Sequence, residues 1–228
     1  METGIAVVVC SRETNQEKKE FLDMIGKTCG FNYHVFFYTN NEGVGLTKIY
    51  NDILDKSPYD LIVYIHDDIE FLKEGWGLEL VKLFDQHKDY GIIGVAGSAE
   101  FDENGAWWNY EKKFGQVLHR WEGKSWLTAF SPLLDKDLQE VAVIDGLFIA
   151  IHKKRISENF SREIESFDFY DIHFCLSNLL KKKCKIGVTT NIRVAHNSIG
   201  KLKDSWYKNR EIINEKFGRK FPIDILKK

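Results

Sequence analysis

The sequence lacks the signatures of several large enzyme classes. No G-x-G-x-x-G follows the first predicted strand and no G-x-x-x-x-G-K-[ST] occurs, which argues against dinucleotide-binding enzymes and P-loop enzymes. There is also no G-x-S-x-G, the nucleophile turn of serine hydrolases. The candidate chemistry must therefore come from polar residues arranged in another way.

Long apolar runs and a targeting segment are missing too. No run approaches the roughly 20 residues that cross a bilayer. The chain enters a predicted strand at once, without a basic and then apolar signal region. The net charge of −2 gives no bulk attraction to nucleic acid or to an anionic membrane. We therefore expect a soluble, cytoplasmic protein with no transmembrane segment and no nucleic-acid partner.

Cysteine is scarce and scattered. None of the four residues has the paired spacing of a metal site. Two of them lie within apolar patterns, as small buried hydrophobes do. The sequence predicts free thiols and a reducing compartment. The four cysteines are Cys10, Cys29, Cys175 and Cys184.

The first part of the chain alternates predicted strands with predicted helices. The first and third strands are apolar runs, which are typical of strands buried in a parallel sheet. The helices carry apolar residues at helical spacing. This order implies right-handed crossovers and a mostly parallel sheet with ligands at the carboxyl ends of its strands. The predicted strands cover residues 4–10, 33–38, 60–65 and 91–96, and the helices cover 17–25, 46–54 and 77–87.

The periodic pattern breaks after residue 97 and resumes near residue 141. Residues 98–140 are rich in Trp, Gly and charge, and we interpret them as a loop and hairpin that cover one side of the site. Later elements are a strand over 141–151, a helix over 169–181, short strands over 185–189 and 191–195, and a helix over 203–217. We predict one α/β domain: a nucleotide-binding half (1–97), an insertion on the acceptor side (98–140) and a catalytic half (141–228).

The strongest local signal is His66-Asp67-Asp68, directly after the third predicted strand. Two adjacent carboxylates repel each other unless a cation lies beside them. Mg²⁺ or Mn²⁺ takes oxygen ligands and carries substrate phosphates on its free positions. The alternative is a solvated turn whose acids cap the next helix. The position after a buried strand favours the metal–phosphate site.

Several short motifs together resemble a known enzyme family. Residues 4–97 and 144–198 resemble the family 2 type of inverting glycosyltransferases, and most closely the streptomycin-biosynthesis-type subgroup. This resemblance implies the glycosyltransferase-A fold, with a mostly parallel, Rossmann-like sheet flanked by helices. The matching segments are the first strand to Cys10-Ser11, G-L-T-K-I-Y-N at 45–51, I-H-D-D at 65–68, I-D-G-L-F-I-A at 144–150, F-Y-D-I-H-F at 169–174 and A-H-N at 195–197.

The resemblance implies a nucleotide and donor site at the strand ends. The end of the first strand borders the base in this family, and a later position that is often acidic in relatives is Asn40 or Asn41 here. Lys48 corresponds to a helix position near phosphate, although a surface lysine is an equally good interpretation. His66 replaces an acid that is frequent in the family. The implied donor-binding residues are Val9, Cys10, Ser11, Asn40, Lys48, Asn51, Asp67, Asp145 and Gly146.

The resemblance also implies the metal ligands. Asp68 corresponds to the last acid of the D-x-D-type motif, and His196 to a histidine that completes metal or pyrophosphate contacts in some relatives. A structural role for His196 is the alternative. Trp107 and Trp108 are candidates for stacking on an acceptor sugar, and packing of the insertion on the core is the alternative.

Asp171 is the candidate catalytic base. It lies near the start of a predicted helix in an aromatic setting, where partial desolvation raises a carboxyl pKa and the helix N-terminus opposes that shift. Inverting transfer needs a base for the acceptor hydroxyl. The alternative is an acid that only stabilises the helix, but Asp168 is expected to cap it and to leave Asp171 free. His173 stands where many relatives have another acid.

Together these features predict a metal-dependent inverting glycosyltransferase that uses a UDP- or GDP-sugar, Mn²⁺ or Mg²⁺, and a carbohydrate or other hydroxyl acceptor. Two alternatives remain open. His66 and His173 leave room for a non-catalytic nucleotide- or sugar-binding module. A sugar nucleotidyltransferase is the other, but the segment after the first strand lacks the glycines of its phosphate loop.

Overall fold

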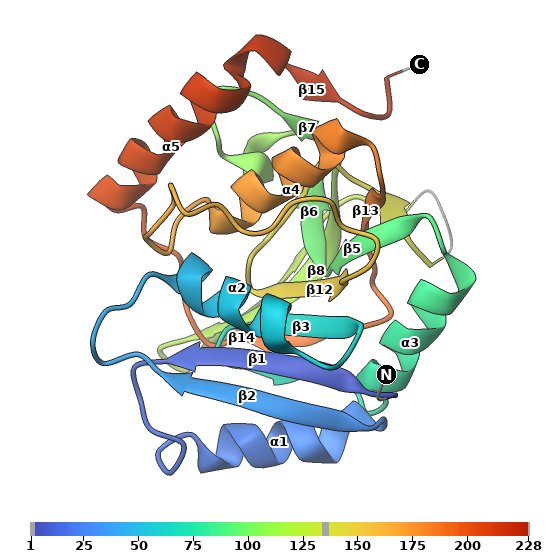
Figure 1. Ribbon diagram of the computed structural model, residues 1–228, viewed down its shortest axis with the longest axis vertical. Helices are drawn as coiled ribbons and strands as arrows, with labels where there is room; N and C mark the ends of the chain where they lie inside the picture. Colours follow the sequence, from blue (N-terminus) through green and yellow to red (C-terminus); the bar gives the residue numbers. More distant parts are fainter. Residues whose placement is uncertain (1–2, 134–136, 228) are drawn as a thin grey trace.

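The computed structural model describes residues 3–133 and 137–227. A seven-stranded sheet forms its centre (Figure 1), in the order β10-β13-β5-β12-β3-β1-β2. Three of its strands are β1 (Ile5–Ser11), β2 (Tyr33–Thr39) and β3 (Leu61–Ile65), and β1 pairs in parallel with both of the others. All three lie within about two residues of their predicted positions.

The other half of the central sheet contains two reversed strands. β12 (Phe148–His152) lies between β3 and β5 (Tyr90–Gly94) and runs antiparallel to both. β13 (Lys185–Val188) is parallel to β5, and β10 (Gln139–Glu140) is antiparallel to β13. The predicted fourth strand is therefore not a neighbour of the third, because a strand from later in the chain separates them.

The described residues contain five α-helices. α1 (Lys19–Cys29) and α3 (Trp76–Gln86) pack against each other, whereas α2 (Leu46–Lys56) contacts β1. α4 (Tyr170–Lys181) contacts β13, and α5 (Asp204–Phe217) leads into the 3₁₀ helix η2 (Gly218–Lys220). No helix within the described residues is long and apolar enough to span a bilayer.

A second sheet covers one side of the molecule. Its order is β11-β6-β8-β14-β4, and β9 pairs with β8. Its strands are β4 (Ile69–Phe71), β6 (Ala96–Ser98), β8 (Lys113–Trp121), β9 (Lys124–Ala129), β11 (Val143–Ile144) and β14 (Val194–His196). Residues 98–133 therefore contain a hairpin, β8–β9, that is joined to the rest of the fold through β8. β7 (Glu100–Phe101) and β15 (Ile223–Asp224) form a separate pair, and η1 is Trp107–Asn109.

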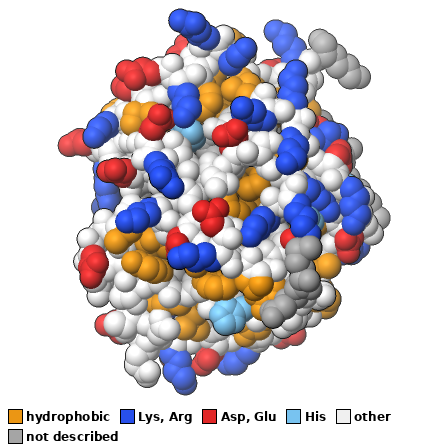
Figure 2. Space-filling model, in the orientation of Figure 1, with side chains coloured by type: hydrophobic (Ala, Val, Ile, Leu, Met, Phe, Trp, Pro, Cys, Tyr) orange, Lys and Arg blue, Asp and Glu red, His pale blue; other side chains and the backbone are white. Residues whose placement is uncertain are grey.

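The hairpin turn follows from its sequence. Glu122 and Gly123 have φ angles of 48° and 74°. Two-residue hairpin turns of the type that matches strand twist need positive φ at both central residues, and glycine adopts it without steric cost. On the face in Figure 2, acidic and basic side chains are interspersed, consistent with the small net charge.

Candidate active site

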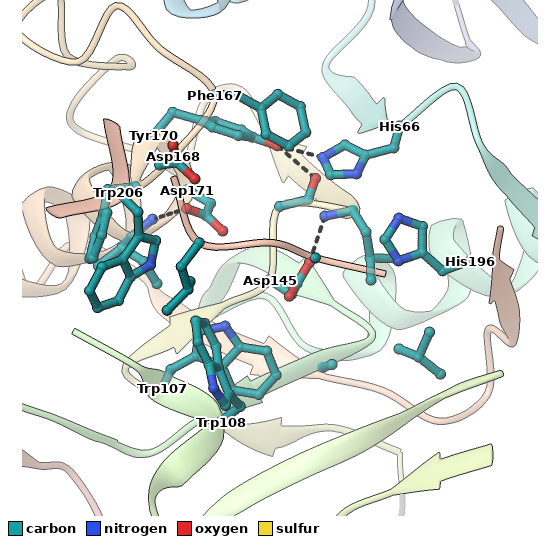
Figure 3. Close-up of a pocket in the computed structure, with 18 of the residues that line it drawn as sticks. His66, Trp107, Trp108, Asp145, Phe167, Asp168, Tyr170, Asp171, His196 and Trp206 are labelled. Carbon is teal, nitrogen blue, oxygen red and sulfur yellow. Dashed lines mark hydrogen bonds between the residues drawn. The ribbon is translucent and has the colours of Figure 1, made fainter. Parts of the chain in front are cut away.

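Two hollows meet at the ends of β3 and β14. The larger has a volume of about 620 Å³ (Figure 3), and the smaller about 160 Å³. Four residues line both: His66, Phe167, His196 and Gly200. The smaller hollow extends towards the end of β1, and the larger one extends towards α4 and the aromatic residues of the insertion. Both lie near the strand end where the sequence predicts ligands.

Three potential metal ligands meet where the hollows join. His66, Asp68 and His196 each offer a donor atom, and these atoms all lie within 4.8 Å of one another. The pairing of β14 with β4 places His196 opposite Ile69, and the Asn197 amide donates to the Asp68 carbonyl at 2.9 Å. Asp68 and His196, predicted as metal ligands, are therefore brought together from positions more than a hundred residues apart. His66 joins them.

The Asp68 carboxylate is incompletely satisfied. Its Oδ1 atom is buried and has no hydrogen-bond partner among the described residues. His196 Nε2 lies 3.3 Å away, which is an ion-pair distance without hydrogen-bond geometry. Burying a charged oxygen without a hydrogen bond is costly, so this atom is suited to a cation.

The pKa shifts of Asp68 and His66 favour the forms that bind a metal, whereas the shift of His196 favours a protonated ring, which would have to lose its proton to a bound cation. Burial raises the pKa of Asp68, but the neighbouring imidazoles outweigh burial and hold it below its usual value. Burial lowers the pKa of His66, which favours the neutral ring. For His196 the attraction of Asp68 outweighs burial and raises the pKa. An ionised carboxylate and a neutral imidazole are the forms that ligate a metal.

Asp67 does not join this group and instead contacts Ser11 and Lys18. Ser11 Oγ donates to Asp67 Oδ2, and Lys18 Nζ lies 3.4 Å from the same oxygen. Lys18 also donates to the Asp67 carbonyl at 3.1 Å. Asp67 therefore already has a hydroxyl and an ammonium partner and lines the smaller hollow, as Cys10 does. Burial raises the pKa of the Cys10 thiol to about 11, which keeps it neutral.

Lys18 is a candidate functional residue that the sequence analysis missed. It lies just before α1 in a polar segment without any periodic signal. Only the packing of this segment against the end of β3 shows that its ammonium group reaches the site.

Five of the predicted donor-binding residues line neither hollow, and one of them, Ser11, instead donates to Asp67. Val9 is completely buried in β1. Asn40 exchanges two hydrogen bonds with Val44 and closes its own turn. Lys48 is exposed on α2, and the buried Asn51 amide exchanges hydrogen bonds of 2.8 and 3.0 Å with the Phe160 backbone. The structure gives these side chains structural contacts or solvent, so their donor-binding roles stay predictions.

Asp171 lies in the first turn of α4 and lines the larger hollow. Phe169 immediately before the helix has φ of 65°, a left-handed conformation that costs a non-glycine residue on the order of 1–3 kcal/mol. Such strain is found where the surrounding structure holds a functional segment in place. Burial raises the pKa of Asp171 to about 7, with a further contribution from the charge of Asp145. A carboxylate with this pKa can act as a base near neutral pH.

The prediction that Asp168 caps this helix is wrong. Among the residues that the structure describes, no side chain caps the N-terminus of α4. Asp168 instead accepts a hydrogen bond from Ser205 Oγ, and its carbonyl accepts one from Asn209 Nδ2 at 2.7 Å. Asp168 bonds to α5 and does not cap α4, because the chain before α4 packs on α5. Asp171 Oδ1 accepts from the Ile172 amide at 2.8 Å.

The loop between β11 and β12 packs closely on the start of α4. Asp145 Oδ1 accepts from the Leu147 amide at 2.9 Å, which shapes the turn. A Cβ atom on Gly146 would lie 2.3 Å from Tyr170 Oη and 3.1 Å from Asp171 Oδ2. Glycine is therefore required for this approach. Both predicted donor-site residues, Asp145 and Gly146, line the larger hollow.

Like His66, His173 departs from the family pattern, but it lies outside both hollows. Only 3% of His173 is exposed, and its ring lies 5.2 Å from that of Phe217 on α5. Burial lowers its pKa to about 4, so it is neutral. His173 lines neither hollow and so does not alter the candidate chemistry.

Aromatic residues form the wall of the larger hollow opposite Asp145 (Figure 3). Trp107 is 5% exposed and packs edge-on against Phe130 at 5.6 Å, as the core alternative predicts. Trp108 is 37% exposed and lies 6.4 Å from Trp206. Trp206 on α5 was not identified from the sequence, because its helical pattern is typical of a packing residue. Of Trp107 and Trp108, Trp108 is the one with an exposed face that a ligand can reach.

The comparisons with known proteins agree with this fold. A model described as a glycosyltransferase like family matches residues 6–217. The structure is similar to GalNAc-T7 solved with UDP, GalNAc and Mn²⁺ (TM-score 0.54, 12% identity), covering 93% of this chain and 47% of that one. It is also similar to S. aureus TarS 1–349 solved with UDP-GlcNAc (TM-score 0.56, 12% identity), covering 94% of this chain and 66% of that one. No curated protein matches significantly.

These structural neighbours establish the fold, and the chain spans less than two thirds of their length. The family model, in contrast, covers nearly all of the sequence. The chain therefore belongs to this glycosyltransferase-like family of transferases and has the family 2 type of glycosyltransferase-A fold.

Proposed function

We propose that the protein is a metal-dependent inverting glycosyltransferase of the streptomycin-biosynthesis type, which moves a sugar from a nucleotide-diphosphate donor to an acceptor hydroxyl. The observation that carries this proposal is the buried Asp68 oxygen, which has no hydrogen bond within the described part of the chain and lies beside His66 and His196 at the junction of the two hollows. Asp171 lines the larger of these hollows, where an acceptor hydroxyl can reach it. The four free cysteines are consistent with a cytoplasmic site of action.

The donor set fits a divalent cation, and favours Mn²⁺ over Mg²⁺. Mg²⁺ prefers oxygen ligands in a strict octahedron, whereas two imidazoles and one carboxylate suit a softer ion. When bound, the cation would offset the negative charge that develops on the leaving diphosphate. The structure of GalNAc-T7 with Mn²⁺ and UDP, on the same fold, supports this assignment.

Residues of the chain itself bind the nucleotide and accept the proton of the acceptor. Lys18 and Ser11 hold the Asp67 carboxylate beside the smaller hollow, on the proposed nucleotide side. UDP is the favoured nucleotide, because both structural neighbours were solved with UDP or a UDP-sugar. During transfer the acceptor oxygen forms a bond to the anomeric carbon as the bond to the diphosphate oxygen breaks. Asp171 takes the proton of the acceptor hydroxyl.

A thermal-shift screen with UDP, GDP, CDP and dTDP tests the donor assignment. We expect UDP to raise Tm with Mn²⁺ present and to have little effect without it. A ligand at 100 times its Kd adds about 2.7 kcal/mol to the free energy of unfolding, which corresponds to a shift of about 5–10 °C for a chain of this size. Mn²⁺ alone is the control. The proposal is contradicted if no nucleotide gives a Mn²⁺-dependent shift.

The pH dependence of turnover tests Asp171 as the base. Because burial raises its pKa to about 7, the ionised form is present above that pH and is lost below it. We expect kcat/KM to fall about tenfold per pH unit below pH 7 and to level off above it. Asp145→Asn removes the repulsion that helps to raise this pKa and should move the rising limb to lower pH.

Asp168→Asn is the matched control for that experiment. Asp168 also lines the larger hollow, but its carboxylate accepts a hydrogen bond from Ser205. Replacing Asp168 should leave the rising limb of the kcat/KM profile near pH 7. A limb that lies near pH 4 in the unmodified protein would exclude Asp171 as the titrating base.

A further inference from the structure

Tyr170 connects the candidate metal group to the loop that faces Asp171. It is the first residue of α4 and is 2% exposed, with its ring 5.7 Å from that of Tyr50. Its hydroxyl lies 3.0 Å from His66 Nε2 and 2.9 Å from the Gly146 carbonyl oxygen, as the dashed lines in Figure 3 show. No role for this tyrosine follows from the sequence motifs.

The two hydrogen bonds determine which nitrogen of His66 carries the proton. A carbonyl oxygen only accepts, so Tyr170 must donate its single hydroxyl proton to Gly146. The same hydroxyl can therefore only accept from His66, and Nε2 must carry a hydrogen. In a neutral imidazole the other nitrogen, Nδ1, then holds a free lone pair. No hydrogen bond among the described residues occupies Nδ1.

We propose that Tyr170 is a positioning residue: it holds His66 in the Nε2–H tautomer and so presents Nδ1 to the divalent cation shared with Asp68 and His196. This inference rests on the proposed function, which supplies the cation. Hydrogen bonds to the non-ligating nitrogen commonly fix the tautomer and orientation of a metal-binding histidine. A buried tyrosine does so here in place of the more usual carboxylate or backbone carbonyl.

The surrounding packing holds the tyrosine in this position. A Cβ atom on Gly146 would lie 2.3 Å from Tyr170 Oη, so only glycine at position 146 permits the hydrogen bond to its carbonyl. The His66 amide donates to the Leu147 carbonyl at 3.1 Å, which holds the same loop beside the end of β3. The strand end, the loop and α4 are therefore connected at one hydroxyl group.

Mn²⁺ binding to the protein without nucleotide tests the proposal. Electron paramagnetic resonance of Mn²⁺ distinguishes free from bound ion and needs no turnover. We expect Tyr170→Phe to raise the Kd for Mn²⁺ by about 10–100-fold, the usual effect of losing a hydrogen bond to a metal-binding histidine. Tyr64→Phe is the matched control. Its hydroxyl is equally buried and donates to the Tyr50 carbonyl at 3.1 Å, but does not contact His66.

Two substitutions of His66 test the choice of nitrogen without changing Tyr170. The side-chain amide of Asn ends near the position of histidine Nδ1, whereas that of Gln ends near Nε2. We therefore expect His66→Asn to keep more Mn²⁺ affinity than His66→Gln. The reverse order would overturn the Nδ1 assignment.

The outcomes separate this inference from the proposed function. Unmodified protein that binds Mn²⁺ with the same Kd as Tyr170→Phe would overturn the positioning role and leave the metal site standing. Unmodified protein that binds no Mn²⁺, alone or with UDP, would contradict both.

Discussion

Replacing Asp171 with Asn should lower kcat by about 10²- to 10⁴-fold, the usual range for loss of a general base. The affinity for the donor nucleotide should remain nearly unchanged. Asn has almost the same shape and can still accept the hydrogen bond from the Ile172 amide, so α4 should begin in the same place. Steady-state turnover of a nucleotide sugar and calorimetric titration with UDP measure the two effects separately. An equal loss of both would show that Asp171 is structural.

Asp171→Asn should lower activity but raise stability. The pKa of Asp171 is about 7 in the fold, against 3.8 for an ordinary carboxyl group. Between these values the folded protein binds more protons than the unfolded chain, so this residue makes stability fall as pH rises. Asp171→Asn removes that penalty. We expect its Tm to exceed that of the unmodified protein by a margin that grows from pH 4 to pH 7 and is constant above.

Asp68→Ala should abolish the contribution of Mn²⁺ to nucleotide binding. Losing a direct ligand should weaken that contribution by at least about 100-fold, since even outer contacts of a metal site are worth 10–100-fold. Calorimetric titration with UDP, with and without Mn²⁺, measures it. UDP binding without Mn²⁺ should be similar in both proteins. Unchanged affinity in the presence of Mn²⁺ would refute Asp68 as a ligand.

Stability without the cation provides an internal check on that variant. Burial raises the pKa of Asp68, but His196 at 3.3 Å and His66 hold it below its usual value, so the ionised carboxylate stabilises the fold near neutral pH. The Tm of Asp68→Ala without Mn²⁺ should therefore fall near pH 7, by a margin that disappears at acid pH. A loss of the same size at every pH would indicate that the substitution disturbs packing and not this ion pair.

The regular elements were the most predictable part of the structure. The strands β1 and β3 are apolar runs bounded by polar turns, and a run that is apolar on both faces has few alternatives to a central strand. The strand β2 was also predicted, but it lies at the edge of the sheet and is only partly buried. The placement of β12 was not predictable from the sequence. Its apolar pattern suits either neighbour and either direction, and only the path of the chain after residue 140 inserts it between β3 and β5.

In the candidate site, too, some residues were predictable from the sequence and others were not. Asp68, His196, Asp145 and Asp171 could be selected because each lies in a short motif that resembles the family. Lys18 and Tyr170 could not, since nothing in their local sequence distinguishes them from a surface lysine and a core tyrosine. Asn51 shows the converse: it matches the family motif, yet its amide is bonded to the Phe160 backbone.

The sequence by itself determined the α/β class, the family and the chemical groups available, because these depend on local periodicity and on short motifs in a particular order. Only the tertiary structure decided which groups act together. The pairing of β14 with β4 brings His196 to Asp68, and the start of α4 brings the Tyr170 hydroxyl to His66. Contacts between residues this far apart in the chain depend on strand order and packing, which leave no local trace in the sequence.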